Sequence, residues 1–484
     1  MKQTKHMTAL LLVALLAASC GGTAPAADDT APADTTAAET TAPSEYQRPD
    51  ADYAGRAVRI GTYEMPTSSW KISDYRLTLT EENGDIINDA LVKTRRTVEE
   101  ELNVTIEPYY IDKSEALTTP VLAGDDEYDF AMIMTKTMPT LLVMPSMLVD
   151  LSDVATLDLS HSWWHQGSVE EFNIKGTQYA AVGDICFYNT AASVVTYINK
   201  QLVEDFKLGD PYQMVRDGKW TIDKMADMCK TVSSDLNGNS EVDVDDRFGL
   251  LCENGSMQYF VTAAGTRFAD WDDSGELGIT VYNERTVDVV EKIVTLFNIR
   301  EQVMMAHQWK GYNNTYFDLF LPTFYDNRAL FYSNQMLVAL EMRAMNGDFG
   351  ILPTPKLDEA QKEYYSIGST AWSDNLVIPA TNTNLDMTGH VIDALGYYAQ
   401  QYATPAFIDY TVLNKSVRDE GSAEMINLIL DTQTFDIGYI FNWGNMRSML
   451  MNMVSKQETG YATAFEAIRP AVEAALEKTL AELN

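Results

Sequence analysis

The sequence has few basic residues and few histidines. Its 484 residues include 70 acidic side chains but only 35 basic ones, which gives a formal net charge of −35. Because a surface this negative repels phosphate backbones, the charge balance argues against a nucleic-acid partner. Only five histidines are present, so the supply of general bases for catalysis is small.

The sequence also lacks the common motifs of enzyme active sites. We find no GxGxxG that opens a helix after a strand, no P-loop, no HExxH and no GxSxG. His161 and His165 have the spacing of two metal ligands on one helix face, but no Glu lies between them, which favours a surface or packing role. Glycosidases need only two carboxylates, so sugar hydrolysis stays open.

Cysteine is scarce as well, with four in the whole chain. Apart from Cys20, the three cysteines at positions 186, 229 and 252 cannot all pair, which excludes a disulfide framework. A bridge between Cys229 and Cys252 is one alternative, and buried free thiols are the default.

The amino terminus is predicted to carry an export signal rather than a membrane span. Its apolar run, residues 8–18, has eleven residues, whereas a spanning helix needs about 20. With Lys2 and Lys5 before it, the run is typical of a signal peptide. Small residues precede Cys20 and resemble a bacterial lipoprotein cleavage box, although an ordinary secretory signal is the alternative. We therefore expect a signal peptide over residues 1–20 and a lipid on Cys20 that holds the protein at the outer face of the cell membrane.

A tether is expected to follow the lipid. Residues 23–52 consist mainly of Ala, Thr, Pro and acidic residues, and Tyr46 is their only large apolar side chain. Such a composition buries too little surface to fold, so residues 21–55 are predicted to be disordered.

The rest of the chain has the hydrophobic content of folded domains. The chain is 46% hydrophobic, and its length suits two to three domains. Apolar patterns predict strands at 57–61, 104–106 and 128–134, with helices at 88–102 and 117–123 between them. This alternation predicts an α/β domain with a parallel sheet. A second α/β pattern starts near residue 192, and the carboxyl-terminal residues 464–483 are predicted to be helical.

Several segments, in order, resemble one family. They are YDFAMIM at 128–134, the stretch 179–184 followed by VTYINK at 195–200, and GILPTP at 350–355. Together with the lipoprotein signal, they resemble the extracellular solute-binding proteins of ABC importers, close in layout to maltose-binding proteins. The resemblance covers roughly residues 56–484.

The resemblance implies a periplasmic-binding-protein-like fold with two hinge-linked α/β lobes. The first lobe would comprise 56–188 plus 370–425, and the second 192–368 plus 430–484. A ligand would lie in the cleft, and a monomer would deliver it unchanged to ABC permease subunits. A carbohydrate, in particular an oligosaccharide, is the expected solute. The alternatives are a peptide or other nutrient, and a surface glycoside hydrolase or polysaccharide-adhesion lipoprotein.

Aromatic residues are the leading candidates for ligand binding. The chain contains 8 Trp, 25 Tyr and 17 Phe, and flat rings stack on sugars while carboxylates and amides accept hydrogen bonds from hydroxyls. The positions that resemble cleft positions in the maltose-binding layout are Trp443, Trp372, Tyr332, Asn334, Asp184, Asp374, Glu253, Tyr259 and Trp70. For each of them the alternative is packing in the core or at its rim.

A calcium-like loop lies at residues 235–246. Oxygen-bearing side chains stand at positions 1, 3, 5, 9 and 12, which is the spacing that wraps a chain around one calcium ion, with the carbonyl of position 7 helping. The expected metal ligands are Asp235, Asn237, Asn239, Glu241, Asp243 and Asp246. The loop resembles EF-hand and dockerin-type loops, but Ser240 replaces the expected Gly and Asp246 is shorter than Glu. The alternative is an acidic turn without metal; with Ca²⁺ the role would be structural.

Overall fold

The computed structural model describes residues 45–483, apart from 64–69, 76, 78, 112, 273, 343, 344, 346, 415 and 416. These residues belong to one compact unit that spans Pro43–Asn484. Within the described part of the chain, no helix has both the length and the apolar character that crossing a bilayer requires. The predicted signal peptide, the lipidation site Cys20 and tether residues 21–44 lie outside the described residues.

Four strands form the first sheet, in the order β14-β3-β1-β2. The strands are β1 (Arg56–Thr62), β2 (Val104–Tyr110), β3 (Phe130–Met134) and β14 (Asp374–Val377). The first three run parallel, and β14 pairs antiparallel with β3. The helices of this part are α1 (Ile86–Leu102), α2 (Glu115–Ala123), α3 (Met138–Leu142), α4 (Gln166–Glu171), α12 (Leu385–Tyr398) and α13 (Thr404–Val412). We call this sheet with these helices the first lobe.

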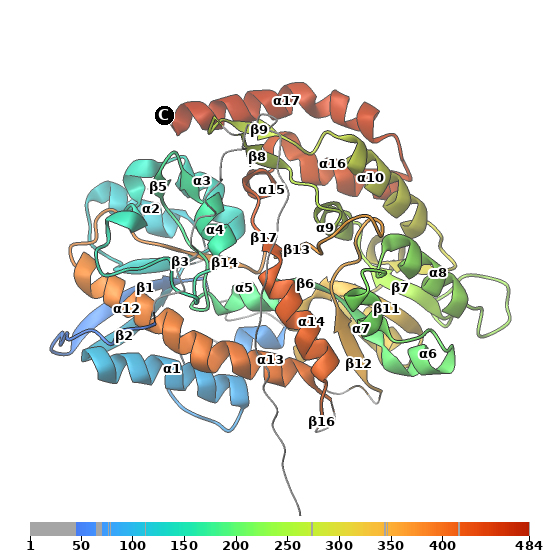
Figure 1. Cartoon of the computed structure of the whole chain (residues 1–484), viewed down its shortest axis with the longest axis horizontal. Coiled ribbons are helices and arrows are strands. Elements are labelled where there is room, and N and C mark those ends of the chain that lie inside the picture. The colour runs from blue at the N-terminus through green and yellow to red at the C-terminus, as the bar shows by residue number, and fades with distance from the viewer. Residues whose placement is uncertain are drawn as a thin grey trace, which may run out of the picture. The chain divides into compact units, whose positions relative to one another are not determined.

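The helix α1 illustrates how sequence produces this lobe. The side chain of Asp85 accepts hydrogen bonds from the backbone N–H groups of Ile87 and Asn88, which caps the helix. Val98 and Leu102, one turn apart, are fully buried in the same core as Ile60 of β1. The helix therefore covers the sheet with its apolar face and also packs against α12 (Figure 1).

Five strands form the second sheet, in the order β10-β7-β11-β6-β12. They are β6 (Val194–Asn199), β7 (Phe248–Cys252), β10 (Val303–Met305), β11 (Ala329–Gln335) and β12 (Phe349–Leu352). β7, β10 and β11 are parallel, whereas β6 pairs antiparallel with both β11 and β12. The helices of this part include α6 (Lys200–Asp205), α7 (Pro211–Arg216), α8 (Ile222–Val232), α9 (Ser256–Ala263), α10 (Glu284–Phe297) and α11 (Leu321–Tyr325). We call it the second lobe.

The chain passes between the two sheets at three places. The first passage contains α5 (Phe187–Ala192), which leads into β6, and the second contains β13 (Ser366–Ile367) and leads into β14. After α13 the chain returns to the second sheet, because α14 (Glu420–Asp431) packs on β12. It then passes through β17 (Gln433–Thr434), which pairs with β13.

The carboxyl-terminal helices are α15 (Ile437–Phe441), α16 (Met446–Lys456) and α17 (Tyr461–Glu482). α17 packs on α16 and on the short 3-10 helix η10 (Trp443–Asn445), and both α16 and α17 contact α10 (Figure 1). The small strands β8 (Ala269–Trp271) and β9 (Leu277–Ile279) form a hairpin that contacts α15.

Residues 45–55 pack against the first lobe, which corrects the prediction that the disordered tether extends to residue 55. The ring of Tyr46 stacks on that of Tyr397 at 4.3 Å between centroids, and its hydroxyl donates to the carboxylate of Glu101. The backbone N–H of Tyr53 donates to the carbonyl of Leu102 at 2.9 Å. The prediction is wrong because one aromatic ring with a hydrogen-bond partner orders a segment whose average composition predicts disorder.

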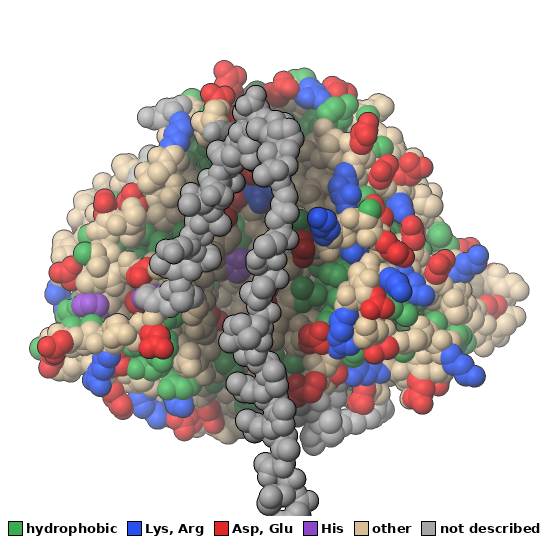
Figure 2. Space-filling view, viewed as in Figure 1, with side chains coloured by type: hydrophobic (Ala, Val, Ile, Leu, Met, Phe, Trp, Pro, Cys, Tyr) green, Lys and Arg blue, Asp and Glu red, His purple; other side chains and the backbone are tan. Residues whose placement is uncertain are grey.

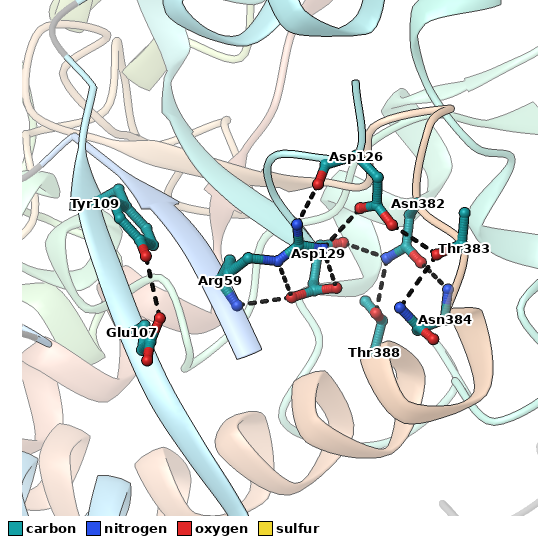
Figure 3. A network of polar contacts seen from close by, with 9 residues as sticks. All are labelled: Arg59, Glu107, Tyr109, Asp126, Asp129, Asn382, Thr383, Asn384 and Thr388. Carbon is teal, nitrogen blue, oxygen red and sulfur yellow. Dashed lines mark hydrogen bonds and ion pairs between the residues drawn. The ribbon is translucent and has the colours of Figure 1, made fainter. Parts of the chain in front are cut away.

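A polar network joins β1 to the segment that precedes α12 (Figure 3). The guanidinium of Arg59 bonds Asp129 at 3.0 and 3.1 Å and Asp126 at 2.7 Å. The amide of Asn382 donates to the backbone carbonyl of Asp129 at 2.6 Å, and the hydroxyl of Thr383 donates to Asp126 at 2.6 Å. Two segments more than 250 residues apart are thereby held together at one end of the first sheet.

Acidic and basic side chains are interspersed on the surface. Over the face shown in Figure 2, Asp and Glu are spread among Lys and Arg rather than gathered in one patch. The cysteines at 186, 229 and 252 are buried and unbridged, so the expected free thiols are present at these three positions.

Candidate functional site

The carboxyl ends of the parallel strands of both sheets carry polar and aromatic residues. Tyr63 follows β1 and Lys136 lies just beyond β3, while Glu253 follows β7 and Gln335 ends β11. In α/β sheets, ligands bind at these ends of the strands. The topology therefore points to the region between the two sheets as the candidate site.

The two lobes touch each other beside these strand ends. The ring of Trp70, after β1, lies 4.5 Å from the ring of Phe317 in the second lobe. The backbone N–H of Lys71 donates to the carboxylate of Glu341 at 2.6 Å, and its ammonium donates to the carbonyl of Leu340 at 3.0 Å. The region is thus closed on this side by a contact between the lobes.

Thr370, in the second passage between the sheets, connects both lobes. Its carbonyl accepts from the backbone N–H of Lys136 in the first lobe at 3.0 Å. Its hydroxyl accepts from the guanidinium of Arg447, at the start of α16, at 2.9 Å. That guanidinium also lies 4.8 Å above the ring of Tyr439. The positive charge of Arg447 is therefore held beside the second passage between the sheets.

Glu253 provides a half-buried carboxylate at the end of β7. It accepts a hydrogen bond from the hydroxyl of Tyr316, and burial together with this carboxylate raises the pKa of Tyr316, which keeps its proton at neutral pH. Nearby, the amide of Gln335 donates to the hydroxyl of Tyr259 at 3.4 Å. The arrangement presents acceptors and hydroxyls side by side, which suits a ligand with many hydroxyl groups.

On the first lobe, a pocket of about 40 Å³ lies against the same strand ends. It is lined by Tyr63, Tyr188 and Asp374, among others. We call the following residues the inter-sheet site: Tyr63, Trp70, Lys136, Glu253, Tyr259, Tyr316, Gln335, Thr370, Asp374 and Arg447.

The structure brings four of the predicted ligand-binding residues to this site. Trp70, Glu253, Tyr259 and Asp374 belong to it, although Tyr259 is only 5% exposed. Trp372 stands half-buried in the chain between Thr370 and Asp374. The loop before Trp70, residues 64–69, lies outside the described residues. Binding by these side chains stays a prediction.

Three other predicted residues pack inside the protein. The ring of Trp443 is 4% exposed, and its indole N–H donates to the hydroxyl of Thr479 on α17 at 2.9 Å. Tyr332 is fully buried, and its hydroxyl accepts from the amide of Asn334 at 2.6 Å. In this structure these side chains offer a ligand almost no surface. Their predicted ligand contacts are untested.

Asp184 lies away from the inter-sheet site. It borders a separate groove of about 620 Å³, where its carboxylate accepts from the hydroxyl of Thr404 at 2.5 Å. Burial raises the pKa of Asp184 to about 6. The two histidines expected to have packing roles point apart, since His161 contacts Asp393 at 3.1 Å and His165 contacts the carbonyl of Leu430 at 3.2 Å.

Sequence reasoning missed Arg447, Tyr316 and Lys136. Arg447 is the second residue of α16 and follows a kink at Gly444 and Asn445, so helical spacing from Trp443 could not have placed it. Tyr316 belongs to a π-helix, Tyr316–Phe320, which has no periodicity signal of its own. Lys136 is exposed, and no motif in the sequence singles it out.

The acidic loop at 235–246 joins α8 to β7, where the sequence places it. The carboxylate of Asp243 accepts from the amides of Asn237 and Asn239 at 2.9 and 2.6 Å. Asp235 accepts from two backbone N–H groups instead, those of Gly238 and Ser240. Hydrogen bonds from the asparagine amides lower the pKa of Asp243. Among the described residues, no three His, Cys, Asp or Glu side chains cluster closely enough to hold a metal by themselves.

Comparison with known proteins identifies the fold. No protein-family model matches the sequence, and no curated protein resembles it in sequence. Among solved structures, the ABC substrate-binding protein Lmo0181 of Listeria monocytogenes, in complex with cycloalternan, matches with a TM-score of 0.56, 12% identity, and 88% of this chain and 99% of that chain covered. The cyclic alpha-maltosyl-1,6-maltose binding protein of Arthrobacter globiformis matches with a TM-score of 0.56, 14% identity, and coverage of 88% and 100%.

A third similar structure is the GacH receptor of Streptomyces glaucescens, solved unliganded and in complex with acarbose. It has a TM-score of 0.54, 12% identity, and coverage of 87% of this chain and 99% of that chain. These likenesses confirm the predicted fold class, a two-lobe α/β fold of the periplasmic-binding-protein type.

Proposed function

We propose that this protein is the solute-binding component of an ABC importer and that it captures a carbohydrate, in particular an oligosaccharide, at the inter-sheet site. It binds its ligand without changing it and passes it to permease subunits as a monomer. The observation that carries the proposal is the convergence of aromatic, carboxylate and amide groups at the carboxyl ends of both sheets in this fold.

The chemistry of the site supports a polyhydroxylated ligand. The carboxylate of Glu253 can accept hydrogen bonds from ligand hydroxyls, and the amide of Gln335 can donate or accept them. The ring faces of Trp70 and Tyr63 provide flat apolar surfaces. Trp70 and Lys71 already contact the second lobe. A ligand that touches both lobes would add further contacts between them and so stabilise the arrangement in which the lobes are closed.

The amino-terminal signal supports a place outside the cell. A lipid on Cys20 would anchor the protein to the outer face of the membrane, and the acidic tether would hold the folded part away from the bilayer.

A thermal-shift screen against a glycan panel tests the proposal. One glycan or a small related set should raise the melting temperature, since a ligand at a hundred times its Kd adds about 2.7 kcal/mol to the free energy of unfolding. Chromatography of the glycan afterwards should recover it intact. Hydrolysis products would instead identify a glycoside hydrolase, and stabilisation by peptides alone would contradict a carbohydrate ligand.

Two variants locate the binding. Trp70→Ala and Glu253→Gln should each weaken glycan affinity at least tenfold, because one removes a stacking face and the other a charged acceptor. Trp271→Ala, at another half-buried tryptophan in the β8–β9 hairpin, is the matched control and should leave the affinity unchanged. Equal affinities in all four proteins would place the ligand elsewhere.

We also propose that the loop at 235–246 holds a structural calcium ion. Carboxylate and amide oxygens are the ligands that calcium prefers, and three of the expected side chains, Asn237, Asn239 and Asp243, already meet. The sixth position of such a loop is usually Gly, because the backbone there is left-handed. Ser240 adopts that conformation, with φ of 63°. Bound calcium would brace the connection between α8 and β7.

Melting curves with calcium and with chelator test this second proposal. Calcium should raise the melting temperature of the protein, and Asp235→Asn should reduce that shift. Asp272→Asn, in a similar acidic turn before β9, is the control and should keep it. Identical curves with chelator and with calcium would exclude the ion.

A further inference from the structure

The groove that contains Asp184 is a second concave site, separated from the inter-sheet site by α5. Phe187 and Tyr188 line the pocket beside Asp374, whereas Asn189 and Thr190, on the same short helix, line the groove. Its walls come from both lobes, since Thr404 belongs to α13 and Asp431 to α14. A ligand in this groove would contact both lobes without touching the inter-sheet site.

The groove is rich in acceptors and contains no Lys or Arg among the described residues that line it. Its titratable groups are Asp184, Asp431 and His165. Burial lowers the pKa of His165, so the ring is neutral. Because its Nε2 lies 3.2 Å from the carbonyl of Leu430, that nitrogen carries the proton and Nδ1 is an acceptor.

The groove contains one buried acceptor without a partner and one carboxylate without a nearby positive charge. Asn189 is 5% exposed, its amide nitrogen donates to Gln433 at 3.1 Å, and its Oδ1 has no partner among the described residues. Asp184 accepts hydrogen bonds from Thr404 and Gln400, yet no basic side chain among the described residues that line the groove balances its charge. Burial raises its pKa, and the hydrogen bonds from Thr404 and Gln400 oppose that rise. A bound cation with N–H donors would donate a hydrogen bond to the free acceptor of Asn189 and balance the charge of Asp184.

We propose that this groove binds a small hydroxylated primary amine in its ammonium form, with the ammonium on Asp184 and hydroxyl groups on the surrounding amides and hydroxyls. An ammonium has three donors and no acceptor, which complements the acceptors of the groove.

Calorimetric titration of the full chain at pH 7 tests the proposal with glucosamine as the probe. Glucose and N-acetylglucosamine are matched controls, because they keep the ring and lose the ammonium. Glucosamine should bind at least tenfold more tightly than either control. Equal affinity for the three sugars, or no heat with glucosamine at 50 mM, would overturn the proposal.

Variants place the probe in the groove. Asp184→Asn should weaken glucosamine binding at least tenfold, and Asp431→Asn, at an exposed carboxylate that lines the same groove, should weaken it by a smaller factor. Asp205→Asn, an exposed carboxylate at the end of α6, should keep the affinity of the unmodified protein. Unchanged affinity in both groove variants would overturn the proposal. Such a failure leaves the carbohydrate proposal standing, because that proposal depends on Trp70 and Glu253.

Discussion

At the scale of single residues, Arg59 shows how a buried charge is balanced. The side chain of Asp129 is 1% exposed, and the guanidinium of Arg59 contacts both of its carboxylate oxygens (Figure 3). The asparagine amide of Asn382 binds the backbone carbonyl of the same aspartate. One ion pair thereby supports both β1 and the segment before α12.

Removing Arg59 should be costly. We expect Arg59→Met to lower the free energy of unfolding by about 3–5 kcal/mol, because it leaves the buried carboxylate of Asp129 without its partner. Urea denaturation measures the change. Arg96→Met is the control: its pair with Glu82 is half exposed on both sides, so we expect a loss below about 1 kcal/mol. Equal losses in the two variants would contradict this account.

Glu171 is a buried carboxyl whose ionisation opposes folding. It contacts Arg267 and the backbone N–H of Ile437, yet burial outweighs Arg267 and raises its pKa from 4.5 to about 7. The folded state therefore binds the proton more tightly than the unfolded state does. The corresponding stability is fully present below pH 4.5 and is lost as the pH rises through about 7.

The variant Glu171→Gln isolates this effect. Between about pH 4.5 and pH 8, the free energy of unfolding of the unmodified protein should fall by about 3 kcal/mol relative to that of Glu171→Gln, which cannot ionise. Denaturant titrations at a series of pH values measure it. Glu473→Gln alters a side chain that is 63% exposed. For this control, the difference in free energy of unfolding from the unmodified protein should not change with pH. A flat difference for Glu171→Gln would contradict the raised pKa.

At the scale of elements, α17 depends on one glycine. Gly444, in η10, has φ of 56°, and a Cβ there would lie 2.7 Å from the backbone nitrogen of Val472 in α17. The absence of a side chain therefore allows α17 to approach η10 and cover Trp443.

We expect Gly444→Ala to lower the free energy of unfolding by about 2–4 kcal/mol, through backbone strain and overpacking. Thermal and urea unfolding measure this. Gly460→Ala is the matched control, since Gly460 has a negative φ and open space around its Cα; its cost should be below about 1 kcal/mol. If both variants lose the same free energy of unfolding, the close packing of α17 does not explain why position 444 is a glycine.

Elements with strong local patterns were predictable from the sequence. Val98 and Leu102 repeat at helical spacing, and α1 ends at the predicted residue. Residues 130–134 are continuously apolar, and they form the fully buried strand β3. The site was less predictable, because its side chains come from distant segments: Arg447 reaches Thr370 across 77 positions. The burial of Trp443 depends on α17, whose packing no pattern near Trp443 reveals.

At the scale of the whole molecule, self-repulsion among carboxylates should limit stability. A formal charge of −35 remains unbalanced although acidic and basic groups are interspersed on the face in Figure 2.

Raising sodium chloride from 20 to 500 mM at pH 8 should therefore raise the melting temperature, by about 1 °C for each kcal/mol that screening recovers in a folded unit of this size. Scanning calorimetry measures the shift. The same salt series near pH 4.5 is the control, because many carboxylates are protonated there and the shift should shrink. A shift of the same size at both pH values would assign it to a general salt effect.

The docking of Tyr46 has a mechanical consequence. Since its ring stacks on Tyr397 of α12 and its hydroxyl binds Glu101 of α1, a force applied to the chain at residue 45 would pass into the first lobe through these two helices.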